Sequence, residues 1–186
     1  FRTHVNYRLS LTSPEEPLEL TSNMLSPGFE DNSKGWVCNG FSPQSNDAFE
    51  LKEGTYYCEI WSGWGNVADG DIHQIVELPN GNYQLTVLAQ NIQESNKAIP
   101  QKGAYVYANN ARKELSLTGK YTLDFVVVDN QAKIGVNTIG CTGNKVSIDD
   151  FHIYYTGFDD DAQFAEFRQM IQEGEALLES PQHADS

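Results

Sequence analysis

The sequence predicts an all-β sandwich followed by one C-terminal helix. Short runs of alternating apolar and polar residues recur along most of the chain, and glycine, asparagine or proline separates them. Alternation with a period of two is typical of strands, and about ten such runs without an intervening helix favour a sandwich. Only the end of the chain has helical periodicity. A length of 186 residues suffices for one well-packed domain with additional segments.

The N-terminal segment alternates cleanly from Phe1 to Leu11 and predicts a strand with one solvent-facing side. Pro14 and Pro17 then interrupt the pattern, because proline cannot donate to a β ladder. A second extended run is expected over residues 18–25. We assign residues 1–22 to an N-terminal strand and linker, and the sequence leaves open whether this strand joins the sandwich or ends a preceding domain.

The middle of the chain supplies the strands of the sandwich. Each expected strand is an alternating or apolar run that turn-forming residues bound. These strands are a short one from Trp36, then residues 48–51, 55–61, a hairpin over 72–87, and 104–108, 121–128, 132–136 and 146–155.

The expected strand over residues 146–155 has bulky side chains on both faces, as a central strand does. Strict alternation places Val146, Ile148 and Asp150 on one face, and Phe151 and Ile153 on the other. We therefore expect this strand to organise the sandwich.

The Asn-Gly dipeptide at residues 80–81 lies between two alternating runs and predicts a two-residue type I′ hairpin turn. In such a hairpin Leu78 faces Tyr83, and Val76 faces Leu85. A β-branched residue in place of the glycine should destabilise the turn, because it resists positive φ.

Residues 158–186 predict an acidic helix. Asp160 and Gln163 have the spacing of a capping box. Half of the formal net charge of −14 lies here, since eight acids stand against Arg168. The helix is expected either to lie on the sandwich or to begin another domain. One helical stripe carries four large apolar side chains: Phe164, Phe167, Ile171 and Leu178.

The composition excludes several function classes. A net charge of −14 disfavours nucleic acids and anionic membranes as partners, and no apolar run approaches membrane-spanning length. Three cysteines, Cys38, Cys58 and Cys141, lack zinc-site spacing, so buried free thiols are expected. Cys38–Cys58 is the pair expected if an oxidising compartment links two of them.

Three stretches together carry a resemblance to a known family. They are PGFEDNSKGW at residues 27–36, IHQIVELPNGNYQLTV at 72–87 and VSIDDFHIYY at 146–155. In this order they resemble carbohydrate-binding modules of the galactose-binding-domain-like jelly-roll type, found in secreted bacterial glycan-degrading proteins. The resemblance covers residues 23–157 and implies a jelly-roll β-sandwich for that range.

The resemblance also implies a structural calcium ion (Ca²⁺) away from the sugar site. Glu30, Asp149 and Asp150 are the expected ligands, since the first and last strands of a jelly roll lie together and Ca²⁺ takes oxygen ligands. The alternative is that these carboxylates accept hydrogen bonds from loop amides without a metal.

The loop at residues 62–70 carries the expected glycan site. Trp64 lies between two glycines, where an indole is hard to bury, and indole rings stack on the apolar faces of sugars. Asn66 and Asp69 are expected to hold hydroxyl groups. Trp61 and Tyr57 are further candidates for ligand contact, although a core position is the alternative for Trp61.

A glycan site also needs a second wall, which residues 91–102 and 137–145 are expected to supply from the same end of the sandwich. Trp36, unlike Trp64, is expected in the core. The four histidines have no metal-ligand spacing, and no catalytic motif of the common hydrolase or nucleotide-binding types is present.

These observations predict a non-catalytic carbohydrate-binding module within a larger bacterial protein that is secreted, periplasmic or on the cell surface. Its expected partners are a neutral glycan and other domains of the same polypeptide. The alternative is a structural domain of the same fold, without a sugar site, that packs against a neighbouring catalytic domain. An exposed Trp64 favours the first hypothesis, whereas a Trp64 buried in a domain contact favours the second.

Overall fold

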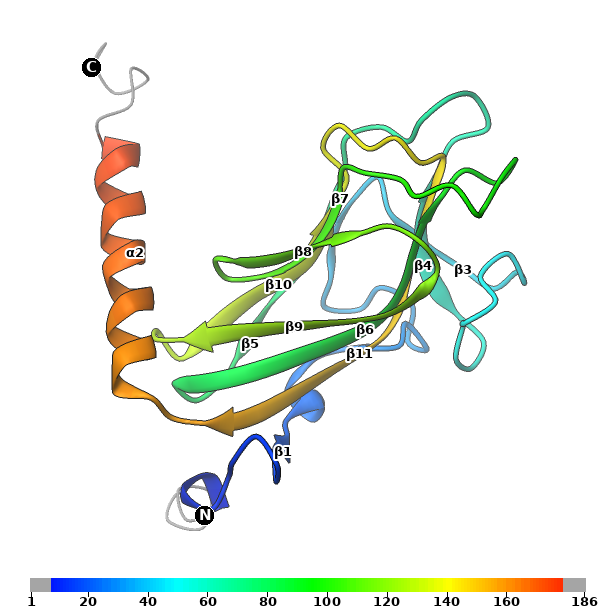
Figure 1. Cartoon of the computed structure of the whole chain (residues 1–186). Helices are drawn as coiled ribbons and strands as arrows, with labels where there is room; N and C mark the ends of the chain where they lie inside the picture. Colours follow the sequence, from blue (N-terminus) through cyan, green and yellow to red (C-terminus); the bar gives the residue numbers. More distant parts are fainter. Residues whose placement is uncertain (1–7, 179–186) are drawn as a thin grey trace.

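The computed structural model describes residues 8–178 and confirms an all-β jelly-roll sandwich with a C-terminal helix. Two antiparallel sheets pack against each other, and helix α2 (Asp160–Leu178) stands beside one end of them (Figure 1). Within residues 8–178, no helix is long and apolar enough to cross a membrane.

Every strand pairs in the antiparallel sense, and the chain crosses repeatedly between two sheets. The six-stranded sheet has the order β3 (Ser42–Gln44), β4 (Tyr57–Trp61), β11 (Lys145–Gly157), β6 (Gly81–Ile92) and β9 (Gly119–Val127), with β1 (Leu18–Glu19) along β11. The five-stranded sheet has the order β2 (Val37–Asn39), β5 (Asp71–Glu77), β10 (Gln131–Asn137), β7 (Ala104–Ala108) and β8 (Ala111–Leu115).

Apolar side chains from the inner faces of both sheets fill the space between them. At one edge, the rings of Phe29, Trp36 and Phe151 form an aromatic cluster, in which the Trp36 centroid lies 5.2 Å from Phe29 and 5.1 Å from Phe151. Trp36 is buried, as expected, and its indole N–H donates to the carbonyl of Ser26.

Strand β11 is central, between β4 and β6. A β-bulge in it changes which residues point into the core. Asp150 and Phe151 together stand opposite Val87, and Asp150 has φ of 51°. Val146 and Ile148 point into the core before the bulge, and odd-numbered residues such as Ile153 do so after it. The expectation of strict alternation was therefore wrong beyond Asp149, because the extra residue shifts the period by one.

The hairpin prediction over residues 72–87 was wrong. Strand β5 belongs to the five-stranded sheet and β6 to the six-stranded sheet, so the chain crosses between the layers after Glu77. Val76 pairs with Ala132, and Leu85 pairs with Leu123 and Ile153. Both arms alternate because each lines the same core from opposite sides, and local alternation does not report which strand is the neighbour.

Three further segments differ from expectation. Residues 8–10 are helical, so the expected strand is wrong there, and its residues 1–7 lie outside the described part. In the run 18–25, a 3-10 turn (Thr21–Asn23) follows β1. Residues 48–51 form a loop, in which Phe49 packs on Tyr57 with ring centroids 5.5 Å apart.

The remaining expected strands are present as β2, β4, β7, β9 and β10, whereas β3 and β8 were not anticipated. β8 follows β7 through a tight turn at residues 109–110, with Ala108 paired to Ala111. The domain limits at residues 22 and 157 stay predictions. All three cysteines are free thiols, and Cys38 is exposed rather than buried.

Asp159 caps the N-terminus of helix α2, whereas Asp160 was the expected cap. The Oδ1 atom of Asp159 accepts the amide hydrogens of Asp161 and Ala162, at 2.8 and 3.2 Å. The helix is joined to the sandwich by Gln163, whose side-chain amide donates to the Val127 carbonyl at 2.8 Å. None of its residues is buried.

Gly81→Val should destabilise the fold by about 1–3 kcal/mol, the usual cost of overpacking a core. A Cβ atom at Gly81 would meet the ring of Tyr155 and would lie 2.8 Å from the carbonyl oxygen of Gly157. Urea unfolding followed by tryptophan fluorescence measures the loss. Gly119→Val is the matched control, because a Cβ there meets nothing within 4 Å. Equal stabilities of the two variants would contradict the close approach.

His152 joins β11 to β1 and should make stability depend on pH. Its Nδ1 lies 2.7 Å from Glu19 Oε1, and its Nε2 lies 2.9 Å from Asp150 Oδ1. Burial lowers the pKa of His152, but Glu19 and Asp150 outweigh this effect and raise it. The hydrogen bond from His152, more than that from Thr21, lowers the pKa of Glu19.

The raised pKa of His152 adds stability below about pH 6.5, which is lost as pH rises through the folded-state value. The lowered pKa of Glu19 adds stability above about pH 4.3, which is lost as pH falls through its folded-state value. His152→Gln should therefore cost most between these limits, about 0.5 kcal/mol for such exposed pairs. Melting curves of both proteins from pH 3 to 9 test this, and a constant difference would contradict it.

Candidate functional site

Three loops gather at the end of the sandwich away from helix α2 (Figure 1). They comprise residues 62–70, 93–103 and 138–144. Backbone hydrogen bonds tie the first to the third, from Ser62 to Asn144 at 2.8 Å and from Val67 to Gly143 at 2.9 Å. The expectation that these loops share one end of the fold is confirmed.

Trp64 stands at the tip of the first loop with 95% of its surface exposed. Gly65 has φ of 76°, which a side chain disfavours, so glycine allows the chain to reverse beside the ring. Ser62 holds the turn, because its hydroxyl donates to the Trp64 carbonyl and accepts from the Trp64 amide. The ring therefore projects from an ordered turn into solvent.

Trp61 lies on the outer face of β4 and is 55% exposed, so the alternative of a core position is wrong. Its indole N–H donates to Glu94 Oε2 at 2.8 Å, and Lys145 Nζ lies 5.9 Å from the ring centroid. A hydrogen-bonded indole has a fixed orientation. Trp61 thus presents a preorganised apolar surface, which lowers the ordering cost of binding.

A polar network lies behind Trp61, in which Tyr57, Glu59 and Lys145 are buried and Glu94 is exposed. Lys145 Nζ is 2.7 Å from Glu94 Oε1 and 3.9 Å from Glu59 Oε2. The hydroxyl of Tyr57 lies 3.0 Å from Glu59 Oε2 and 2.7 Å from Asn46 Oδ1. Tyr57 is fully buried, so it supports this network and presents no surface of its own.

The pKa values of the two carboxylates of this network shift in opposite directions. Burial raises the pKa of Glu59 more than Tyr57 and Lys145 lower it. Burial acts in the same direction on Glu94, but hydrogen bonds from Lys145, Trp61 and Asn144 together lower its pKa. Lys145 lies closer to Glu94 than to Glu59, and its ammonium group joins both carboxylates rather than leaving a gap between them.

The polar residues expected to hold sugar hydroxyls also join the loops to one another. Asn66 Oδ1 accepts from Gln93 Nε2 at 3.1 Å, and Asp69 Oδ1 accepts from the Gly140 amide at 3.0 Å. Both residues remain exposed beside Trp64 in the chain. Glu94 and Lys145 were missed, since the register that places Lys145 opposite Trp61 cannot be deduced from either segment alone.

Of the expected calcium ligands, the structure brings Glu30 and Asp149 to one corner. Glu30 Oε1 accepts the amides of Thr55 and Tyr56, at 2.9 and 2.8 Å. Each oxygen of the fully buried Asp149 accepts one amide at 2.8 Å, from Glu53 and from Asp150. Both carboxylates therefore accept backbone amides, and the calcium ion at this corner stays a prediction.

Asp150 does not join this corner, because the bulge turns its side chain toward His152. Burial raises the pKa of Asp149 to about 7, and the charges of Asp150 and Glu30 add to the effect. Gly54 leaves room for Glu30, since a Cβ there would lie 2.6 Å from its carboxylate. Within residues 8–178, no three acidic, histidine or cysteine side chains converge on a metal position, so calcium would also need backbone carbonyls.

No protein-family model matches the sequence, and no curated protein matches it either. Similarity appears with solved structures. TmCBM61, solved in complex with β-1,4-galactotriose, has a TM-score of 0.55 and 20% identity, covering 72% of this chain and 97% of that one.

Two other solved structures are similar. The CBM22-1 xylan-binding domain of Xyn10C from Paenibacillus barcinonensis has a TM-score of 0.50 and 12% identity, covering 73% of this chain and 95% of that one. The Stig cyclase Fisc from Fischerella sp. TAU has a TM-score of 0.55 and 11% identity, covering 77% of this chain and 100% of that one. At such low identities the likeness concerns the fold alone, and an enzyme shares it. The chain has the jelly-roll fold of carbohydrate-binding modules.

Proposed function

We propose that this domain is a non-catalytic module that binds a neutral glycan at the loop end of the sandwich. Trp64 would be the stacking platform, with Trp61 as a second, fixed surface beside it. The observation that carries the proposal is the exposure of Trp64, at 95%, on an ordered turn. An indole held in this way can stack on the apolar face of a sugar ring without first being ordered.

The chemistry of the loop end suits weak recognition of sugar rings. Stacking that hides about 100 Å² of apolar surface contributes about 2.5 kcal/mol before ordering costs. Asn66, Asp69 and Glu94 supply hydrogen-bonding groups around the two indoles. Asp69 and Glu94 are exposed acids at the loop end and would repel an acidic glycan, which favours a neutral one.

The bridging position of Lys145 favours binding over hydrolysis. Glycoside hydrolysis uses two carboxylates on either side of the scissile bond, about 5–10 Å apart. Here both Glu59 and Glu94 reach the same ammonium group, and Glu59 is buried. We infer that the network positions Trp61 and that any hydrolytic activity belongs to other parts of a larger secreted or cell-surface bacterial protein.

Trp64→Ala should abolish detectable glycan binding and leave stability within about 0.5 kcal/mol of the original, because an exposed loop residue contributes little to the core. A glycan array on the isolated chain, followed by calorimetric titration, should give dissociation constants from about micromolar to millimolar. Affinity should change little with salt, since a neutral ligand has no charge to screen.

Ile75→Ala is the matched control, because Ile75 is also apolar and exposed, at 61%, but lies on the outer face of the other sheet. It should bind like the original chain. A blank array together with an unfolded Trp64→Ala variant would instead assign Trp64 a structural role. New reducing ends in the incubated glycan would contradict the non-catalytic part.

We also propose calcium as a structural ion at the corner of Glu30 and Asp149, as the resemblance to carbohydrate-binding modules implies. The buried carboxylate of Asp149 and the space that Gly54 leaves beside Glu30 support it. Bound calcium would neutralise these two acids and fasten the loop at residues 53–56 to β11.

If calcium binds the folded chain alone, a concentration about 100 times its dissociation constant should add about 2.7 kcal/mol of stability. EDTA should lower the melting temperature, and Asp149→Asn should remove this sensitivity. Asp150→Asn is the matched control and should keep it, because Asp150 faces His152. A melting temperature that neither EDTA nor added calcium changes would contradict the site.

A further inference from the structure

Helix α2 presents an apolar face that no other element of the described chain covers. Phe164, Phe167 and Ile171 lie along it with 62%, 50% and 47% of their surfaces exposed. Its hydrogen bonds to the sandwich come from Gln163 and Glu166 in the first two turns. Most of the stability of a helix in a protein comes from packing one face, so a face this apolar indicates an interaction surface.

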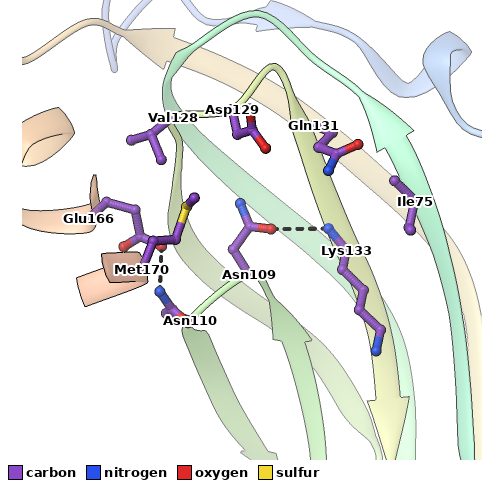
Figure 2. A pocket seen from close by; sticks show the side chains of 9 residues that line it. All are labelled: Ile75, Asn109, Asn110, Val128, Asp129, Gln131, Lys133, Glu166 and Met170. Carbon is purple, nitrogen blue, oxygen red and sulfur yellow. Dashed lines mark hydrogen bonds between the residues drawn. The ribbon is translucent and has the colours of Figure 1, made fainter. Parts of the chain in front are cut away.

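A hollow of about 280 Å³ adjoins this face, between α2 and the turns at residues 109–110 and 128–130 (Figure 2). Met170, three residues after Phe167 and on the same side of the helix, forms part of its wall. Val128 and Ile75 add further apolar surface from the sandwich. The apolar face of α2 therefore continues into a recess.

The charges around the recess and the face are mostly negative. Asp129 and Glu166 line the hollow, and Glu166 is held by the side-chain amide of Asn110 at 2.9 Å. Lys133 also lines it, but its ammonium points along β10 away from Glu166 and lies 6.0 Å from the Tyr107 ring centroid (Figure 2).

Helix α2 itself carries five acids against one base over residues 160–178. That base, Arg168, lies over the Phe164 ring at 4.9 Å. A second copy of this chain would bring acids against acids, which costs free energy at close range. Charge complementarity instead selects a basic partner.

We propose that the apolar face of α2 and the adjoining hollow dock an amphipathic helix of another protein segment, in which lysine or arginine borders the apolar stripe. The stripe on α2 follows helical periodicity, so a second helix matches its ridges and grooves. One long basic side chain enters the hollow, with its alkyl stem against Met170 and Val128 and its charge near Glu166 and Asp129.

The test uses the chain as it stands with two synthetic amphipathic peptides. One peptide carries leucine along one face of the helix and lysine along the rest. The other has glutamate in place of every lysine. Calorimetric titration should show binding of the lysine peptide, weakened by added salt, and at least tenfold weaker binding of the glutamate peptide.

Variants identify the surface, because a net charge of −14 attracts any cationic peptide to some extent. Phe167→Gln with Ile171→Gln should weaken binding of the lysine peptide about tenfold or more, while glutamine keeps the helix. Glu166→Gln should weaken it about three- to tenfold and reduce the salt dependence. Ile139→Gln, an exposed apolar residue at the loop end, is the control and should have no effect.

Three outcomes would overturn the proposal. The first is equal affinity of the original chain and the α2 double variant for the lysine peptide. The second is equal affinity for both peptides, which would remove the role of charge. The third is a dimer in sedimentation experiments that the α2 double variant converts to a monomer, since a second copy would then cover the face. Helix content from circular dichroism should stay unchanged in each variant.

Discussion

The rest of the structure depends on the pairing of β11 with β4 on one side and β6 on the other. This strand supplies core residues along its whole length only because the bulge at Asp150 shifts its facing by one residue. The same shift separates two neighbouring acids, so that Asp149 is buried beside the Glu30 corner while Asp150 reaches His152. At its first residue, Lys145 pairs opposite Trp61 and joins the carboxylates behind it. One strand thus connects the core, the loop end and the N-terminal segment.

Much of the architecture could be predicted from local patterns. The alternation at 104–108, 121–128 and 132–136 corresponds to strands, because half-buried strands must present one apolar face to the core. The exposed loop around Trp64 follows from its glycines. Strand partners could not be predicted in this way. Residues 72–87 have the alternation and turn residues of a hairpin, yet their arms face each other across the core as members of different sheets.

The candidate site shows the same division. Trp64 could be named from the sequence because exposure of a ring between two glycines is a local property. Glu94 and Lys145 could not, because their meeting depends on the register of β11 with both neighbours. The bulge could not be predicted either. Aspartate can adopt positive φ, but an aspartate in a sequence indicates positive φ less strongly than a glycine does. Tyr57 is buried, although alternation alone would place its ring on the outer surface of the sheet. The loop that carries Phe49 packs over this ring.

The two ends of the molecule offer different kinds of interaction, so binding at each end can be distinguished by its salt dependence. At the loop end, three loops joined by backbone hydrogen bonds carry Trp64 near Trp61 of β4, and apolar stacking on these indoles would be screened little by salt. At the helix end, an acidic helix without buried residues faces solvent, so contacts there combine apolar burial with charges that salt does screen. The loop end and the helix lie at opposite ends of the sandwich (Figure 1), and they share no hydrogen bond among residues 8–178. Occupation of one end should therefore leave affinity at the other unchanged, because coupling requires an element with two arrangements that both sites bias, and a closely packed jelly roll offers none between them.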